Sequence, residues 1–164
     1  MYTFTDEIVG LQPINVSSPT QNHSPGMITH ANDAVLGGGE FIYQLGVANT
    51  VVGSLVTYGP AQTTLSPAGA LTGVQAAPVA VAMSANGAGQ WGWYQVSGQA
   101  VLAKDGSAPA AGAPVYLGAA AGQVSATQAA GRQLVGASFA AAALAGAASV
   151  NVLLSRPTIE GQII

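Results

Sequence analysis

Residues 41–47 read Phe-Ile-Tyr-Gln-Leu-Gly-Val, and this stretch decides the fold class. The large side chains at the odd-numbered positions alternate with those at positions 42, 44 and 46. A period of two residues is typical of a β-strand that buries one face. The glycines at positions 37–39, just before this stretch, mark a loop. We therefore predict a half-buried strand at this point of the chain.

Similar short runs continue along the chain and are separated by turn residues. Further strands are expected around His30 and at residues 55–58, 79–83, 90–96, 100–103, 115–117, 123–125, 134–138 and 150–154. Asn86-Gly87 predicts a tight hairpin, because both turn positions of such a hairpin favour positive φ. This many short strands predict an all-β fold, namely a small β-barrel or β-sandwich of short antiparallel strands.

Residues 139–148 are ambiguous because they are rich in alanine. Alanine favours helix, but the segment is shorter than the roughly 12–15 residues that a stable isolated helix needs. We expect a loop with at most one helical turn.

The chain also contains a weak internal repeat. Residues 52–61 match residues 111–120 at four positions, always 59 residues apart: Gly53 with Gly112, Val56 with Val115, Gly59 with Gly118, and Ala61 with Ala120. Each copy enters a short strand through one glycine and leaves it through another. The matches indicate either a duplicated β-unit or a coincidence in a chain rich in glycine and alanine.

Residues 1–26, the N-terminal arm, differ from the rest of the chain. Prolines at positions 13, 19 and 25 disfavour helix and central strand. Large apolar residues nevertheless recur in the arm: Phe4, Ile8, Val9, Leu11, Ile14 and Val16. We expect an extended arm that buries these groups on the surface of a partner. The alternative is a disordered terminus.

The β-domain is expected to span residues 27–156 and to be followed by a short tail, residues 157–164. Pro157 is expected to end the last strand, because proline lacks a backbone donor. The tail carries Ile159 and Ile163, which suggests that it docks on a surface.

Composition excludes several classes of function. Only 5% of the residues are charged, against about 25% in ordinary domains. Cysteine is absent, which excludes disulfides and thiolate chemistry. The net charge is −3 and the cations Lys104, Arg132 and Arg156 lie far apart in sequence, which argues against a nucleic-acid partner. A surface of Ser, Thr, Gln, Asn, Ala and Gly is easily desolvated and suits protein contacts.

No membrane partner is expected either. Residues 138–152 are the longest apolar candidate, and they fall short of the roughly 20 residues that a membrane-spanning helix needs. The N-terminus lacks the basic region and apolar stretch of a signal peptide. We expect a soluble protein made in the cytosol.

The titratable residues do not form a convincing catalytic or metal-binding set. Asp33 and Glu40 flank the glycine run and are best explained as solvated loop residues. His30 lies near Asp33, but a metal site normally draws three or four ligands. No serine lies in a Gly-x-Ser-x-Gly motif, so a small hydrolase is a remote alternative. We expect no enzymatic activity, no metal and no cofactor.

Trp91 and Trp93 lie two residues apart and therefore point to the same face of a strand. They form either a platform for a partner or ligand, as large aromatic residues often do, or part of the core. Tyr94 and Val96 face the other side. A carbohydrate-binding β-module is a second functional hypothesis that rests on these tryptophans.

Three stretches resemble capsid decoration (cement) proteins of tailed bacteriophages: residues 31–53, residues 89–101, which include Gly89-Gln90-Trp91-Gly92-Trp93, and residues 111–117. The resemblance spans residues 27–155. It implies a small β-barrel-like subunit on the outside of an expanded phage head. It also implies a trimer, or less commonly a dimer, that reinforces contacts between major capsid proteins, with an N-terminal arm that becomes ordered on the capsid. Another virion component, such as a head fibre or tail part, is the alternative within this class.

Overall fold

Eleven strands form one antiparallel sheet in the computed structural model, which describes residues 1–6, 10–59, 63–65 and 77–160. The strands are β1 (Thr3–Phe4), β2 (Ile28–Asp33), β3 (Gly37–Leu45), β4 (Leu55–Tyr58), β5 (Thr63–Leu65), β6 (Ala77–Ala82), β7 (Trp91–Ala103), β8 (Pro114–Leu117), β9 (Val124–Ser125), β10 (Gln133–Phe139) and β11 (Ser149–Glu160). The predicted all-β fold is confirmed. The sheet does not close into a barrel.

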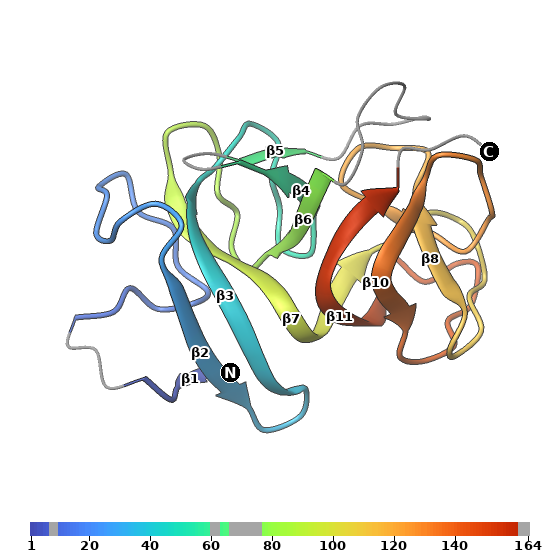
Figure 1. Ribbon diagram of the computed structural model, residues 1–164, viewed down its shortest axis with the longest axis horizontal. Coiled ribbons are helices and arrows are strands. Elements are labelled where there is room, and N and C mark those ends of the chain that lie inside the picture. Colours follow the sequence, from blue (N-terminus) through green and yellow to red (C-terminus); the bar gives the residue numbers. More distant parts are fainter. Residues whose placement is uncertain (7–9, 60–62, 66–76, 161–164) are drawn as a thin grey trace.

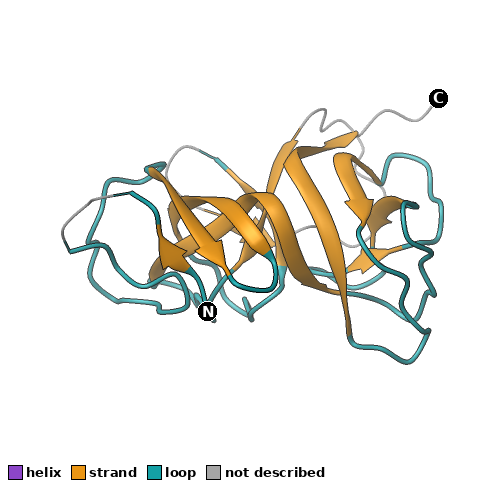
Figure 2. Cartoon of the chain, turned by 90° about the horizontal axis from the view of Figure 1, so that it is seen from below, coloured by secondary structure: helices purple, strands orange, loops and turns teal. Residues whose placement is uncertain are grey.

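Two long strands, β7 and β11, join the two halves of the molecule (Figure 1). Residues 97–103 of β7 pair with residues 149–155 of β11. Where the two strands diverge, β6 lies between them and pairs with β7 at one end and with β11 at the other. The N-terminal half of β7 continues into β3, β2 and β1, whereas β11 continues into β10, β8 and β9. The molecule is elongated (Figure 2).

The internal repeat is present in the strand pairing. Strands β4 and β8 lie 59 residues apart, and Gly53 and Gly112 before them both have positive φ, 83° and 78°. Each strand forms a hairpin with the next one and then pairs with the strand after that. The pairing of β6 with β7 also recurs: Val81 with Gln95 corresponds to Ser138 with Leu153. We call β3–β6 with residues 91–97 of β7 the first unit, and residues 98–103 of β7 with β8–β11 and the loops between them the second unit.

Two local predictions about turns and strand ends are wrong. Asn86-Gly87 does not form a tight hairpin: β6 ends at Ala82, β7 begins at Trp91, and the positive φ in this loop belongs to Gly89, 76°. Pro157 does not end the last strand, because β11 continues to Glu160. The residue before the proline, Arg156, has a φ of 45°, so the strand bends there and continues.

Other local predictions hold in part. Residues 90–96 and 100–103 form one strand, β7, that passes through Gly98, whose φ of 95° only glycine adopts readily. Residues 140–148 form a loop with a turn and no helical turn, as the length argument favoured.

Three clusters of buried apolar side chains form the core. The largest fills the second unit and includes residues from both units, among them Leu55, Leu102, Phe139 and Ile159. The second contains Tyr94 and Val96 on one face of β7. The third lies on the opposite face of β7 and contains Trp93, Tyr43, Phe41, Ala31 and Ile14. Ile14 brings the N-terminal arm into this third cluster, and three further apolar residues of the arm pack against it.

Candidate functional site

The N-terminal arm packs on the aromatic face of β3 and β7. Ile14 is 3% exposed and lies in the same cluster as Tyr43 and Trp93, and Leu11 packs against that cluster. The ring of Phe4 lies 6.4 Å from that of Trp93 in an edge-on arrangement, as aromatic pairs prefer. The arm therefore completes the core of its own chain.

Gln12 holds the arm in place by hydrogen bonds through every polar group it has. Its side-chain nitrogen donates to the carbonyls of Val16 (2.6 Å) and Trp91 (3.0 Å). Its side-chain oxygen accepts from Asn22 and from the hydroxyl of Tyr43, both at 2.9 Å. Because Gln12 is 5% exposed, these bonds form in a site that largely excludes water.

His23 provides the acceptor for the last donor of this network, the backbone N–H of Gln12. The backbone N–H of Gln12 donates to Nε2 of His23 over 3.0 Å, so this nitrogen carries no proton and the ring is neutral. The imidazole packs edge-on against Tyr43, with 5.0 Å between ring centroids. Burial lowers the pKa of His23. The hydrogen bond from the backbone N–H of Gln12 requires this neutral state of the imidazole.

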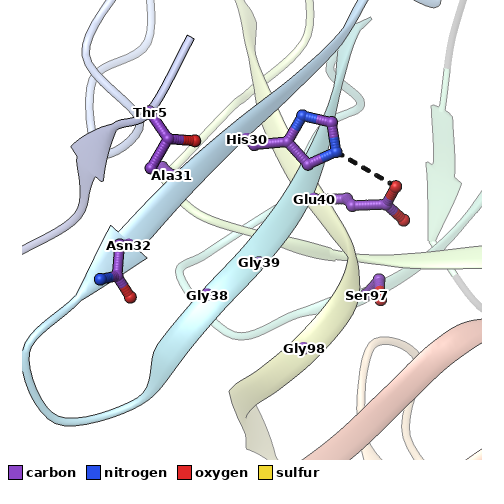
Figure 3. A pocket seen from close by; sticks show the side chains of 9 residues that line it. All are labelled: Thr5, His30, Ala31, Asn32, Gly38, Gly39, Glu40, Ser97 and Gly98. Carbon is purple, nitrogen blue, oxygen red and sulfur yellow. Dashed lines mark hydrogen bonds and ion pairs between the residues drawn. The ribbon is translucent and has the colours of Figure 1, made fainter.

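A second polar site lies where the arm, the β2–β3 hairpin and β11 meet. Nδ1 of His30 is 3.3 Å from Asp6 of the arm, and Nε2 is 3.4 Å from Glu40 on β3. Arg156 of β11 donates two hydrogen bonds of 3.1 Å to the carboxylate of Glu40. A shallow groove runs beside this chain of polar contacts and is lined by Thr5, His30, Ala31, Asn32, Gly38, Gly39, Glu40, Ser97 and Gly98 (Figure 3).

The carboxylates of this site are held in their charged form. The backbone N–H of His30 donates to Asp6 over 2.8 Å and lowers the pKa of that carboxyl. The bidentate contact from Arg156 lowers the pKa of Glu40. Polar contacts thereby join the arm, the β2–β3 hairpin and β11. Figure 3 shows the imidazole of His30 directed toward Glu40 across β2 and β3.

The contacts that the described residues make in this groove are hydrogen bonds and ion pairs. Among these residues, none of the hydrogen bonds to His30 comes from a hydroxyl group. Within the same residues, no group of three metal-ligating side chains is close enough to hold an ion. The predicted neighbour of His30, Asp33, instead accepts hydrogen bonds from the backbone of Val35 and Leu36.

The structure separates the residues predicted to bind a partner into three groups. Ile14, Trp93 and Ile159 are buried in the core, and Phe4, Leu11 and Trp91 pack against it. Val16 is exposed. Ile8, Val9 and Ile163 lie outside the described residues. The tryptophans do point to the same face, as expected, but Trp93 is fully buried there beneath the arm.

Sequence reasoning missed two buried polar anchors. Gln12 reads as one more polar residue of a proline-rich segment. Lys104 is 4% exposed, and its ammonium donates to the carbonyls of Asp105 (2.8 Å), Ser107 (2.6 Å) and Ala145 (3.2 Å). The one available signal was scarcity, because Lys104 is the only lysine of the chain and is therefore a candidate for a structural role.

No helix among the described residues has the length and apolar character needed to cross a bilayer. Comparison with protein-family models, with curated proteins and with solved structures found no match.

Proposed function

We propose that the protein is a structural component of a bacteriophage virion. In this role it decorates the outside of the head and reinforces contacts between major capsid proteins. Its proposed partners are the major capsid protein and copies of itself, and it has no catalytic role in this proposal.

The state of the charged residues carries the proposal. All three cations are engaged or shielded by the chain itself: Lys104 is buried on carbonyls, Arg156 is paired with Glu40, and Arg132 is half-buried. Large apolar side chains are exposed instead: Met1, Val16, Val35, Val51, Val52, Val101, Val135, Leu144 and Leu153. Such a surface is easily desolvated and favours uncharged protein neighbours.

A repeating shell suits such a surface, because many weak contacts act together at high effective concentration. The N-terminal arm also suits a structural role. It covers the aromatic face of the sheet, and the buried polar groups of Gln12 all have hydrogen-bond partners there. The carbohydrate-binding alternative requires an exposed pair of tryptophans, and Trp93 is 0% exposed. We therefore do not carry that alternative further.

The test is co-sedimentation of the full chain with expanded capsids assembled from the major capsid protein of the same virus. Saturable binding at a fixed number of copies per capsid is expected, together with a higher temperature of capsid disruption. Because few charges are free, binding should persist at high salt. Absence of binding to expanded capsids overturns the proposal. Deleting residues 1–26 is not a suitable control, since the deletion removes core residues such as Ile14.

A further inference from the structure

One face of the second unit is bare where the equivalent face of the first unit is covered. In the first unit, Tyr43 pairs with Trp93, and the N–H of Met83 donates to the carbonyl of Trp93 over 3.2 Å. In the second unit, Val101 pairs with Asn151, and the N–H of Ala140 donates to the carbonyl of Asn151 over 2.9 Å. The two rows therefore occupy the same place in the two units.

The next row along the strands repeats the comparison. Phe41 pairs with Gln95 in the first unit, and Tyr2 of the arm covers both, with its ring 5.0 Å from that of Phe41. The corresponding pair in the second unit is Gln99 with Leu153. Leu153 is 52% exposed and Val101 is 42% exposed. No segment of the described chain covers them as the arm covers the first unit.

We call this bare surface the second face. It consists of outward-pointing residues of β7, β10 and β11: Gln99, Val101, Ser138, Asn151, Leu153 and Ser155. The three strands lie side by side across the middle of the molecule (Figure 1). Cross-strand pairing fixes their relative positions, so the second face is a pre-formed surface. None of its residues carries a charge.

The second face carries both an exposed apolar side chain and a shallow groove. Leu153 projects beside a shallow groove that is also lined by Gly136, Ala137, Ser138 and Ser155. A large apolar side chain thus lies next to a groove lined by small residues. Two copies that meet face to face about a twofold axis can place each Leu153 in the groove of the other.

We propose that the second face is where two copies of this chain pair. An uncharged face is matched by an uncharged partner, and a second copy of the same face supplies one, whereas nucleic acid or an anionic lipid surface requires cations. Gln99 and Asn151 can exchange side-chain hydrogen bonds with their counterparts across the axis. The inference rests on the part of the proposed function that gives the protein copies of itself as partners.

The test is the mass of the full chain in solution, measured by sedimentation equilibrium over a range of concentrations. Wild type is expected at twice the 16.1 kDa of one chain. Leu153→Lys and Val101→Lys each place charges at the centre of the pairing surface and are expected to give monomers with an unchanged circular dichroism spectrum. Val35→Lys is the matched control, since Val35 is 88% exposed at the β2–β3 turn, and it should remain a dimer.

Gln99→Cys gives a second readout if a lysine variant fails to fold, because the chain has no other cysteine. Its thiol should be protected from maleimide in the dimer, whereas that of Val35→Cys should react at once. A monomeric wild type at high concentration overturns the inference, as does a dimer that survives both lysine variants. A monomer that binds capsids and loses binding on Leu153→Lys also overturns it, and leaves the proposed function standing with the capsid on this face.

Discussion

The indole nitrogen of Trp93 donates a hydrogen bond of 2.8 Å to the backbone carbonyl of Gln12. This bond ties the beginning of β7 to the middle of the N-terminal arm, and both partners are buried. The arm is therefore part of the folded domain. A buried indole N–H needs an acceptor, and here the acceptor comes from a segment more than 70 residues away in the chain.

Replacing Gln12 with alanine should destabilise the protein by about 2–4 kcal/mol, because the Tyr43 hydroxyl, the Asn22 amide and the carbonyls of Val16 and Trp91 lose their partner. Urea denaturation followed by tryptophan fluorescence measures this loss. Gln21→Ala, at an exposed position of the same arm, should change stability by less than about 0.5 kcal/mol. Equal effects of the two variants would show that the arm is not held by Gln12.

The stability of the arm should depend on the protonation of His23. Burial lowers the pKa of His23 in the folded state, so the unfolded chain binds the proton first as pH falls below about 6.5. The free energy of unfolding should therefore decrease as pH falls through this value, and level off below the pKa of the folded state. His23→Gln keeps an acceptor for the N–H of Gln12 but does not titrate.

The measurement is the urea midpoint at several pH values between 8 and 5, in roughly the range where only histidine titrates. Wild type should lose stability toward pH 5 relative to His23→Gln. Parallel curves for the two proteins would exclude His23 as the titrating group.

How far the sequence predicts this fold can be judged from particular residues. The alternation at residues 41–47 correctly predicted a strand, but β3 begins at Gly37, within the expected loop, and its residues 41–44 are buried on both faces. The 59-residue match of Gly53 with Gly112 corresponds to a structural repeat. The burial of Trp93 by the arm could not be predicted, because local patterns do not show which distant segment covers a face. Likewise, the pairing of Glu40 with Arg156 depends on the bend in β11. Both contacts form between segments that are far apart in the chain, and local sequence patterns do not show how such segments align.

Arg156 combines an exposed ion pair with a backbone conformation that favours glycine. Its φ is 45°, which costs an L-residue about 1–2 kcal/mol. The ion pair with Glu40 is exposed and contributes little. Arg156→Ala loses the pair and keeps the strain, whereas Arg156→Gly loses the pair and relieves it. We expect Arg156→Gly to be about 1 kcal/mol more stable than Arg156→Ala in thermal unfolding. The opposite order would mean that the side chain, and not the backbone, dominates at this position.

Lys104 should control the order of the alanine-rich loop. Its ammonium joins the end of β7 to Ala145, and Lys104→Met leaves three carbonyls without this donor. A loss of about 2–3 kcal/mol is expected, with faster elastase cleavage within residues 140–148. Gln128→Ala, at an exposed site of the same unit, should leave both measurements unchanged. Unchanged cleavage in Lys104→Met would show that the loop is held by its backbone contacts alone.

Asn86 explains why glycine occurs in β7, at Gly92, and directly after β3, at Gly46. A Cβ on Gly92 would lie 2.1 Å from the side-chain nitrogen of Asn86, and a Cβ on Gly46 would lie 2.3 Å from its backbone oxygen. Both Gly92→Ala and Gly46→Ala should destabilise the protein, by about 1–3 kcal/mol or more, through overpacking.

The clash at Gly92 is with a side chain, so adding Asn86→Gly should remove much of the penalty of Gly92→Ala. The clash at Gly46 is with the backbone, so the same addition should leave the penalty of Gly46→Ala in place. A double-mutant cycle measured by urea denaturation distinguishes the two cases, and equal coupling of Asn86→Gly to both alanine variants would contradict the packing described.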